Sequence, residues 1–223
     1  RSCRTLCFMG VPMGLQYSIT AIGSIFLQSA VNGLGSLYVA AVAAGAKLFQ
    51  LLGCPYDALG ATMATYCGQN VGAVKLDRLG KGIRACSLLG LIYALAAFGA
   101  MLLFAPQSTM LFLDPTEPQL DTLVALTAQY VRILTAFFFP LALVNIVRFS
   151  IQGMGYSGLA ILAGVMEMIA RMAVALVFVP LFGYTAACFA SPAAWICADA
   201  FLIPACMGSI VRLKKIYAKA PEA

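Results

Sequence analysis

Six long apolar stretches, separated by loops that are alternately basic and free of Lys and Arg, constrain this chain more than any other feature. Each stretch has roughly 20 to 30 residues, enough for an α-helix to cross the ~30 Å hydrocarbon core of a bilayer. The stretches lie at residues 8–30, 39–68, 85–104, 122–152, 159–182 and 192–211. The pattern predicts an all-α, polytopic integral membrane protein in which residues 1–223 form a single six-helix domain.

The loops predict how these helices are oriented. Lys and Arg cluster before the first stretch, between the second and third, and after the sixth, at Arg1, Arg4, Lys75, Arg78, Lys81, Arg84, Arg212, Lys214, Lys215 and Lys219. The opposite loops contain no Lys or Arg, and one of them is acidic, with Asp114, Glu117 and Asp121. Cytoplasmic loops carry the excess of positive charge, so we expect a multi-pass protein of the cell inner (cytoplasmic) membrane with both termini in the cytoplasm. Arg148, near the inner end of the fourth stretch, is interpreted first as a topology residue.

Composition excludes several other classes of protein. With 62% hydrophobic and 10% charged residues, the chain is too apolar for a soluble domain of this size. The net charge of +6 lies where membrane topology requires it, so we expect the lipid bilayer, and no nucleic acid, as a partner. The first residue is Arg rather than Met, which suggests a piece of a longer polypeptide.

No catalytic or metal-binding pattern is present in the sequence. The eight cysteines form no C-x-x-C pair, and the chain has no histidine to complete a metal site. They are interpreted as small buried residues, at Cys3, Cys7, Cys54, Cys67, Cys86, Cys188, Cys197 and Cys206. G-x-S-x-G and paired intramembrane aspartates are also absent, so we expect neither an enzyme nor a cofactor.

Charged residues inside the membrane are the strongest functional signal, because each costs several kcal/mol unless it meets a partner or a cavity. In the second stretch, polar and small residues recur every three or four positions, at Lys47, Gln50, Cys54, Asp57, Ala61 and Thr65. This spacing places them on one helix face, which we expect to look inward. Asp57 falls near the middle of the bilayer, and Pro55 frees a backbone carbonyl one turn upstream, as a further ligand or a bend point. Asp57 is interpreted as a carboxylate that responds to protons or cations, or alternatively as one satisfied by helix packing or a water pocket.

Three other stretches contribute candidates for a substrate path or a gate. In the fifth, Glu167 and Arg171 are one turn apart, as a structural ion pair or as a gate that opens during transport. In the sixth, Asp199 follows Trp195 by one turn, and we interpret Trp195 as an anchor at the membrane interface. The first stretch offers a neutral polar wall at Gln16, Tyr17, Thr20, Ser24 and Gln28.

These residues resemble a known family. Residues 55–78, PYDALGATMATYCGQNVGAVKLDR, are similar to the eighth helix and following cytoplasmic loop of multidrug and toxic compound extrusion (MATE) transporters. The segments that resemble its seventh, tenth, eleventh and twelfth helices are PMGLQ at 12–16, NIVR to QGMG at 145–155, EMIAR at 167–171 and AWICAD at 194–199. The resemblance covers essentially the whole chain, but only the carboxy-terminal six-helix lobe of a twelve-helix member.

The resemblance implies multidrug or organic-cation efflux by antiport with H⁺ or Na⁺. The substrate would be a small amphipathic molecule, often a cation, held between two lobes that rock against each other. The amino-terminal lobe would come from the same chain or from a second copy. Family members with a cation site in this lobe use acids in the seventh and tenth helices, and the matching stretches here lack Asp and Glu in their cores. The chain thus looks more like the branch whose coupling carboxylate lies in the first helix of the other lobe, and Asp57 is the best local candidate for ion coupling. The substrate-path or gating candidates are Gln16, Tyr17, Gln50, Glu167, Arg171 and Asp199.

Two alternatives stay open at this point. A flippase for a lipid-linked saccharide belongs to the same superfamily, and it would need a strongly cationic cleft, whereas the basic residues Lys47, Arg132 and Arg171 are dispersed. A membrane enzyme or an assembly subunit is the other alternative, which the absence of catalytic patterns disfavours.

Overall fold

The computed structural model describes residues 2–116 and 119–218, with the backbone alone for residues 2–9, 12 and 13. Every regular element among them is helical. The elements are α1 (Ser2–Asn32), α2 (Ser36–Gly72), α3 (Asp77–Met110), α4 (Leu120–Ala136), α5 (Phe138–Gly153), α6 (Ser157–Ala173), the π-helical segment η1 (Val174–Phe178), α7 (Val179–Phe182) and α8 (Tyr184–Ala218). Arg1, Glu117 and Lys219, which enter the topology prediction, lie outside the described residues, as do the side chains of Cys3, Arg4 and Cys7.

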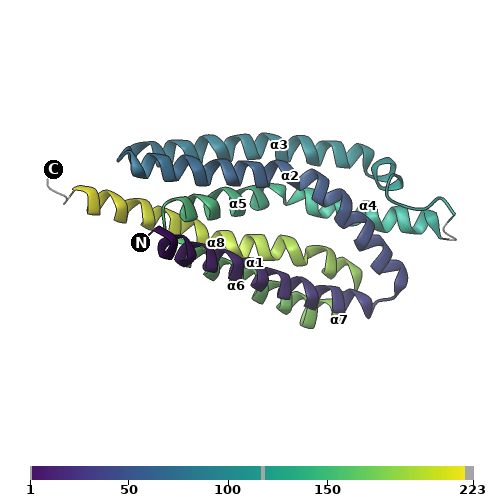
Figure 1. Ribbon diagram of the computed structural model, residues 1–223. Coiled ribbons are helices and arrows are strands. Elements are labelled where there is room, and N and C mark those ends of the chain that lie inside the picture. Colours follow the sequence, from purple (N-terminus) through teal and green to yellow (C-terminus); the bar gives the residue numbers. More distant parts are fainter. Residues whose placement is uncertain (1, 117–118, 219–223) are drawn as a thin grey trace.

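The helices run along one long axis, and both chain termini lie at the same end of the molecule (Figure 1). The α2–α3 and α5–α6 connections lie at that end too, whereas the α1–α2 and α3–α4 connections lie at the other. The basic residues in the α2–α3 connection and at the start of α3 therefore share one end with those near the end of α8. The acidic loop around Asp114 is at the opposite end. The loops are thus segregated by charge, and the cytoplasmic location of the termini stays a prediction.

The chain is an all-α membrane protein. Among the described residues, four helical stretches are long and apolar enough to cross a membrane, namely α2, α3, α8 and the continuous stretch Ser157–Phe182. The bent pair α4 and α5 makes a fifth if it is counted as one span. Large apolar side chains are exposed along them, including Leu95, Leu103 and Leu181, as expected for surfaces covered by lipid tails. The stretch expected at residues 8–30 lies within α1. α1 is not among these candidate membrane-spanning helices, so the prediction that it crosses the membrane stays a prediction.

The stretch expected at residues 122–152 is divided in two. α4 ends at Ala136 and α5 begins at Phe138, with a bend of 51° between them. Pro140 explains the break, because its ring has no N–H to donate to the carbonyl four residues earlier, which is that of Ala136. The bend places Phe138 in the core, where it is fully buried.

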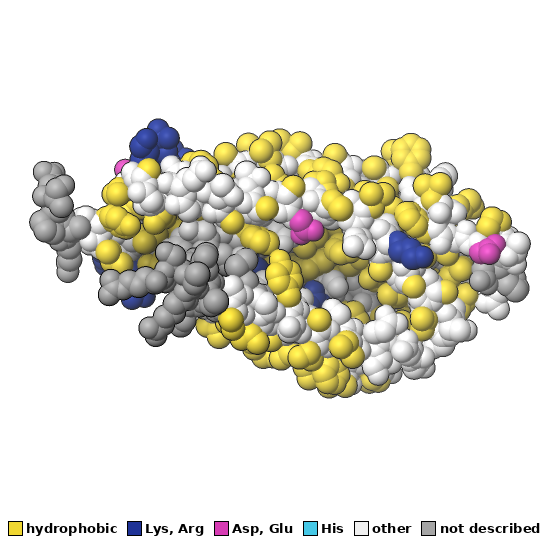
Figure 2. Space-filling model, in the orientation of Figure 1, with side chains coloured by type: hydrophobic (Ala, Val, Ile, Leu, Met, Phe, Trp, Pro, Cys, Tyr) yellow, Lys and Arg dark blue, Asp and Glu magenta, His cyan; other side chains and the backbone are white. Residues whose placement is uncertain are grey.

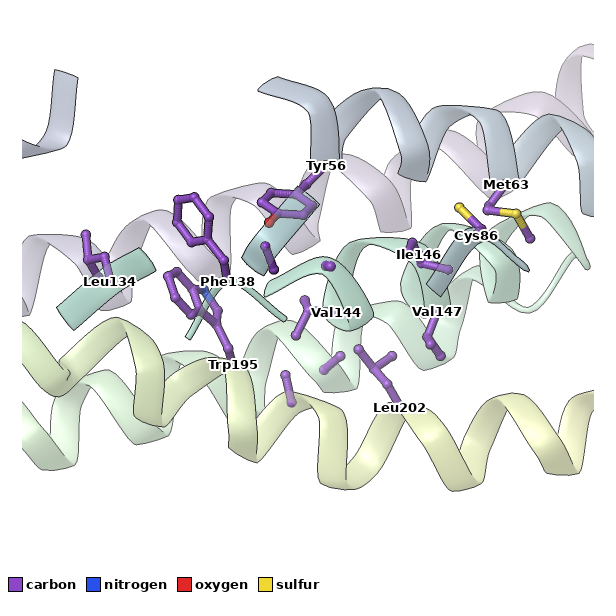
Figure 3. Packing of buried hydrophobic residues seen from close by; sticks show 14 of the residues in the cluster. Tyr56, Met63, Cys86, Leu134, Phe138, Val144, Ile146, Val147, Trp195 and Leu202 are labelled. Atoms are coloured by element: carbon purple, nitrogen blue, oxygen red, sulfur yellow. The ribbon is translucent and has the colours of Figure 1, made fainter. Parts of the chain in front are cut away.

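Aromatic side chains join α2, α5 and α8 in the core. Figure 3 shows Tyr56, Phe138 and Trp195 converging from these three helices. The rings of Tyr56 and Phe138 meet edge to face with centroids 5.3 Å apart, and Trp195 stacks on Phe49 at 5.8 Å. Trp195 is only 3% exposed, so the interpretation of it as an interfacial anchor is wrong. Ala194 and Ala198 beside it are fully buried, and such small residues allow α8 to approach its neighbours closely enough to cover the indole ring.

Two hydrogen bonds to the Asp114 side chain order the acidic loop between α3 and α4. The Asp114 carboxylate accepts hydrogen bonds from the backbone N–H of Thr116 at 2.9 Å and from its hydroxyl at 2.7 Å. Both bonds favour the charged form, so they hold the pKa of Asp114 below its ordinary value.

The contact between α2 and α5 depends on a glycine. A Cβ atom on Gly153 would lie 2.3 Å from the carbonyl oxygen of Ala64 and 3.0 Å from its Cα. Backbone atoms cannot rotate away as a side chain can, so Gly153→Ala must push the two helices apart. We expect Gly153→Ala to lower the free energy of unfolding by about 1–3 kcal/mol. Unfolding in detergent, followed by circular dichroism, measures this change.

The matched control for this prediction is Gly99→Ala. Gly99 lies inside α3, and a Cβ there would meet nothing within 4 Å. Alanine has the higher helix propensity, so the control should be neutral or slightly stabilising. An equal effect of the two substitutions would contradict the proposed contact.

Candidate functional site

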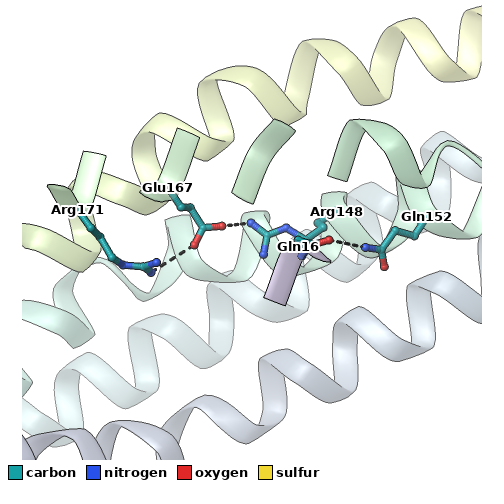
Figure 4. A network of polar contacts seen from close by, with 5 residues as sticks. All are labelled: Gln16, Arg148, Gln152, Glu167 and Arg171. Atoms are coloured by element: carbon teal, nitrogen blue, oxygen red, sulfur yellow. Dashed lines mark hydrogen bonds and ion pairs between the residues drawn. The ribbon is translucent and has the colours of Figure 1, made fainter. Parts of the chain in front are cut away.

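A cluster of buried charged side chains lies between α5 and α6. Glu167 of α6 occupies its centre and forms ion pairs with Arg148 of α5 and with Arg171, one turn further along α6 (Figure 4). The Arg171 Nη2 atom is 3.3 Å from Glu167 Oε2. Glu167 is 3% exposed and each arginine 7%, so all three charges are removed from solvent. One carboxylate is thus shared between two guanidinium groups.

A further carboxyl group lies in the same region. Asp199 of α8 is 8% exposed and makes no ion pair among the described residues. Its Oδ1 atom has no hydrogen-bond partner in the described part of the chain, and the same is true of Arg148 Nε and Arg171 Nη1. The cluster therefore pairs one carboxylate with two guanidinium groups and leaves several polar atoms unpaired. Buried polar groups in this condition are uncommon in cores that serve stability alone.

Two glycines bring α1 against this cluster. Gly164 of α6 faces Gln16 and Thr20 of α1, where a Cβ would lie 3.3 Å from the Gln16 side chain. Gly23 of α1 faces Met168 and Arg171 of α6. Small residues at such crossings allow helix backbones to approach closely in a membrane protein.

The close approach of α1 creates a second polar contact. Gln152 of α5 donates a hydrogen bond from Nε2 to Gln16 Oε1 at 2.8 Å, in a buried position (Figure 4). This bond connects α1 to α5 through two residues that are 136 positions apart in the sequence. Gln16 is therefore held inside the chain, whereas its neighbour Tyr17 is 60% exposed.

The predicted stripe on α2 lies elsewhere. Its members are all exposed, namely Lys47, Gln50, Cys54, Asp57, Ala61 and Thr65. This face is exposed in this chain because α2 uses its other faces to pack on α4 and α5, so the expectation that it looks inward, toward a second lobe, stays a prediction. Asp57 forms no ion pair among the described residues. The spacing of three or four residues correctly grouped these six side chains on one face. Spacing alone does not say what that face contacts.

The exposed stripe borders a depression. α1 packs mainly on α6, and α2 mainly on α5, so the two helices scarcely touch each other beyond their connecting turn. Figure 2 shows the surface hollowed between them. A polar helix face at the rim of a hollow has the shape of one wall of a cleft.

Arg148 is a functional candidate that the sequence analysis interpreted first as a topology residue. It is buried and paired with Glu167, so it does not serve as a loop charge at the membrane surface. The signal available in the sequence was its position one turn before Gln152, which places both on the face of α5 that meets α1 and α6.

In the described part of the chain, no three His, Cys, Asp or Glu side chains are placed to hold a metal ion. Of the six cysteines described there as free thiols, Cys54 and Cys197 are exposed and the other four are buried.

Comparison with known proteins identifies the family. The family model described as MatE matches residues 12–177. This chain belongs to the MatE family. The matched region contains α2, the glutamine pair and the buried ion pairs of Glu167, so the features described above belong to the family part of the chain. A comparison with curated protein sequences gives no match.

Solved structures of MATE transporters have the same fold as this chain. One is a MOP superfamily transporter from Pyrococcus furiosus Vc1 (DSM3638), which is 21% identical to this chain with a TM-score of 0.79. Its binding pocket is described as having a reverse polarity that suggests a different function. The outward-facing conformation of a multidrug resistance MATE family transporter is 20% identical with a TM-score of 0.77. Each comparison covers 89% of this chain and 43% of the other. This MatE chain therefore spans less than half the length of these transporters.

Proposed function

We propose that this MatE chain is one lobe of an antiporter that expels small amphipathic organic cations as H⁺ or Na⁺ enters. The substrate would bind in a cleft between this lobe and a second one, with the exposed stripe of α2 and the neighbouring hollow as one wall. Alternating access would follow from rocking of the lobes about that cleft.

The observation that supports this proposal most is the position of Asp57. Its side chain is exposed halfway along a helix that is apolar enough to cross a membrane, and it has no ion-pair partner in the described chain. A carboxylate facing lipid at that depth would be strongly unfavourable, so the face that carries it needs a polar cavity. A cleft filled by water, substrate cation or coupling ion meets this need.

The charge distribution favours an organic cation over a lipid-linked saccharide. A flippase for a phosphorylated lipid would present free positive charge to its cleft, whereas Arg148 and Arg171 are buried and paired with Glu167. The stripe of α2 carries Lys47 and Asp57, one charge of each sign, which does not amount to a cationic surface.

Transport by the reconstituted native polypeptide tests the proposal. Vesicles receive an outward-directed or inward-directed gradient of H⁺ or of Na⁺, and uptake of a fluorescent organic cation is followed over time. We expect accumulation that depends on one of the two gradients and that an ionophore for that ion abolishes. Folded protein that moves a labelled lipid-linked saccharide between leaflets, but no cation under either gradient, would overturn the proposal in favour of a flippase.

A further inference from the structure

A groove of about 320 Å³ lies between α3 and α8, on helices that do not carry the stripe of α2 or the glutamine of α1. Gly80 and Arg84 belong to its α3 wall, and Met207 and Val211 to its α8 wall. Val147 of α5 lies between the two walls and is buried. Met207 and Val211 are 65% and 51% exposed, so the groove is open along its length.

The groove exists because α3 and α8 both pack on α5 but scarcely on each other. Their one ion pair among the described residues joins Lys214 Nζ to Asp77 Oδ1 at 2.5 Å. Asp77 begins α3, so this ion pair bridges the two walls at the end of the molecule that holds both termini. The groove is thus bounded by charge at one end and continues between apolar walls toward the middle of the helices.

Arg84 is the charged residue in the lining of this groove. It lies seven residues into α3, roughly 10 Å from the start of the helix, and directly before the apolar stretch at residues 85–104. That position corresponds to the boundary between the headgroups and the hydrocarbon core. Arg84 has no acidic partner among the described residues, and Lys81 adds a second exposed positive charge one turn closer to the end.

We propose that this groove binds an anionic phospholipid from the leaflet on the basic side of the molecule. The guanidinium group of Arg84 recognises the phosphate, for which its planar set of donors is suited. An acyl chain then lies along the apolar walls, past Met207 and Val147. A basic residue beside a cleft between membrane helices is the arrangement that selects anionic headgroups.

The test is lipid retention by the native polypeptide, measured by native mass spectrometry. The purified protein is stripped of lipid in detergent and titrated with phosphatidylglycerol or with phosphatidylcholine that has the same acyl chains. We expect phosphatidylglycerol to be preferred, and Arg84→Gln to reduce its binding by about fivefold, the effect of one basic residue near an anionic lipid. The matched control is Arg78→Gln, which removes an exposed charge at the same end but outside the groove and should keep the preference.

A second variant tests the acyl part of the site. Gly80 lines the groove, and a Cβ there meets nothing within 4 Å, so we expect the side chain of Gly80→Leu to occupy groove space. It should reduce the binding of both lipids alike, in contrast to Arg84→Gln. Equal binding of the two lipids by the unmodified protein, an unchanged preference in Arg84→Gln, or unchanged lipid binding in Gly80→Leu would each overturn the proposal.

Discussion

Glu167→Gln should lower the free energy of unfolding by about 3–5 kcal/mol, because it leaves two buried guanidinium groups without the carboxylate that both pair with. Glutamine has nearly the same size as glutamate, so the change removes the charge without opening a cavity. Arg148 and Arg171 are each 7% exposed and cannot turn to solvent without moving α5 or α6. Denaturation in mixed detergent micelles, with helix content as the signal, gives the unfolding free energy.

The exposed ion pair of this chain provides the matched control. Asp77 and Lys214 are in contact, but their side chains are 89% and 47% exposed. Water and salt already screen an ion pair of this kind, so Asp77→Asn should leave the stability nearly unchanged. A loss of stability in Glu167→Gln no greater than that in Asp77→Asn would contradict the assignment of Glu167 as the centre of the cluster.

A double substitution separates charge balance from packing. In Glu167→Gln combined with Arg171→Gln, Arg148 is the one positive charge left in the cluster, so one of the two uncompensated charges is removed. We therefore expect the double variant to be more stable than Glu167→Gln alone, which is the non-additivity typical of residues in one network. If Glu167→Gln instead keeps its stability but loses transport, the ion pair is a gate, the second of the two interpretations drawn from the sequence.

The parts of this structure that sequence reasoning could predict are those that depend on neighbours along the chain. The apolar stretches fall within the helices because helix length and hydropathy are local properties. The pairing of Glu167 with Arg171 follows from one helical turn. The break at Phe137 also has a local cause, because Pro140 lies within the otherwise continuous apolar stretch.

The other features depend on which helices meet, and a single sequence does not contain that information. The hydrogen bond between Gln16 and Gln152 joins residues that are 136 positions apart, on two different helices. The pairing of Arg148 with Glu167 requires α5 to lie against α6. The stripe of α2 shows the same limit of sequence-based prediction. Periodicity groups Gln50 and Asp57 on one face, but whether that face meets the interior or is exposed is decided by the packing of α2 on α4 and α5.

Asp57→Asn should reduce gradient-driven uptake of an organic cation by about tenfold or more while leaving the protein folded. A gradient can drive transport only if the ion binds the two facing states with different affinities. A carboxylate at the depth expected for Asp57 supplies such a difference, because its charge is costly wherever the cleft is closed and the ion is absent. Asparagine has the same shape but no charge, so it removes the coupling and leaves the geometry of the cleft.

Three comparisons make this prediction specific to the charge of Asp57. Asp57→Glu keeps the carboxylate and should keep a substantial part of the coupling. Asp114→Asn removes a carboxylate from the loop at the end of the molecule opposite the termini, outside the proposed cleft, and should transport normally. Asp57 makes no ion pair in the described chain, so its replacement by Asn should not lower the unfolding temperature. Coupled uptake by folded Asp57→Asn at the rate of the unmodified protein would mean that the ion binds elsewhere, and the cluster around Glu167 and Asp199 would then be the next place to test in this lobe.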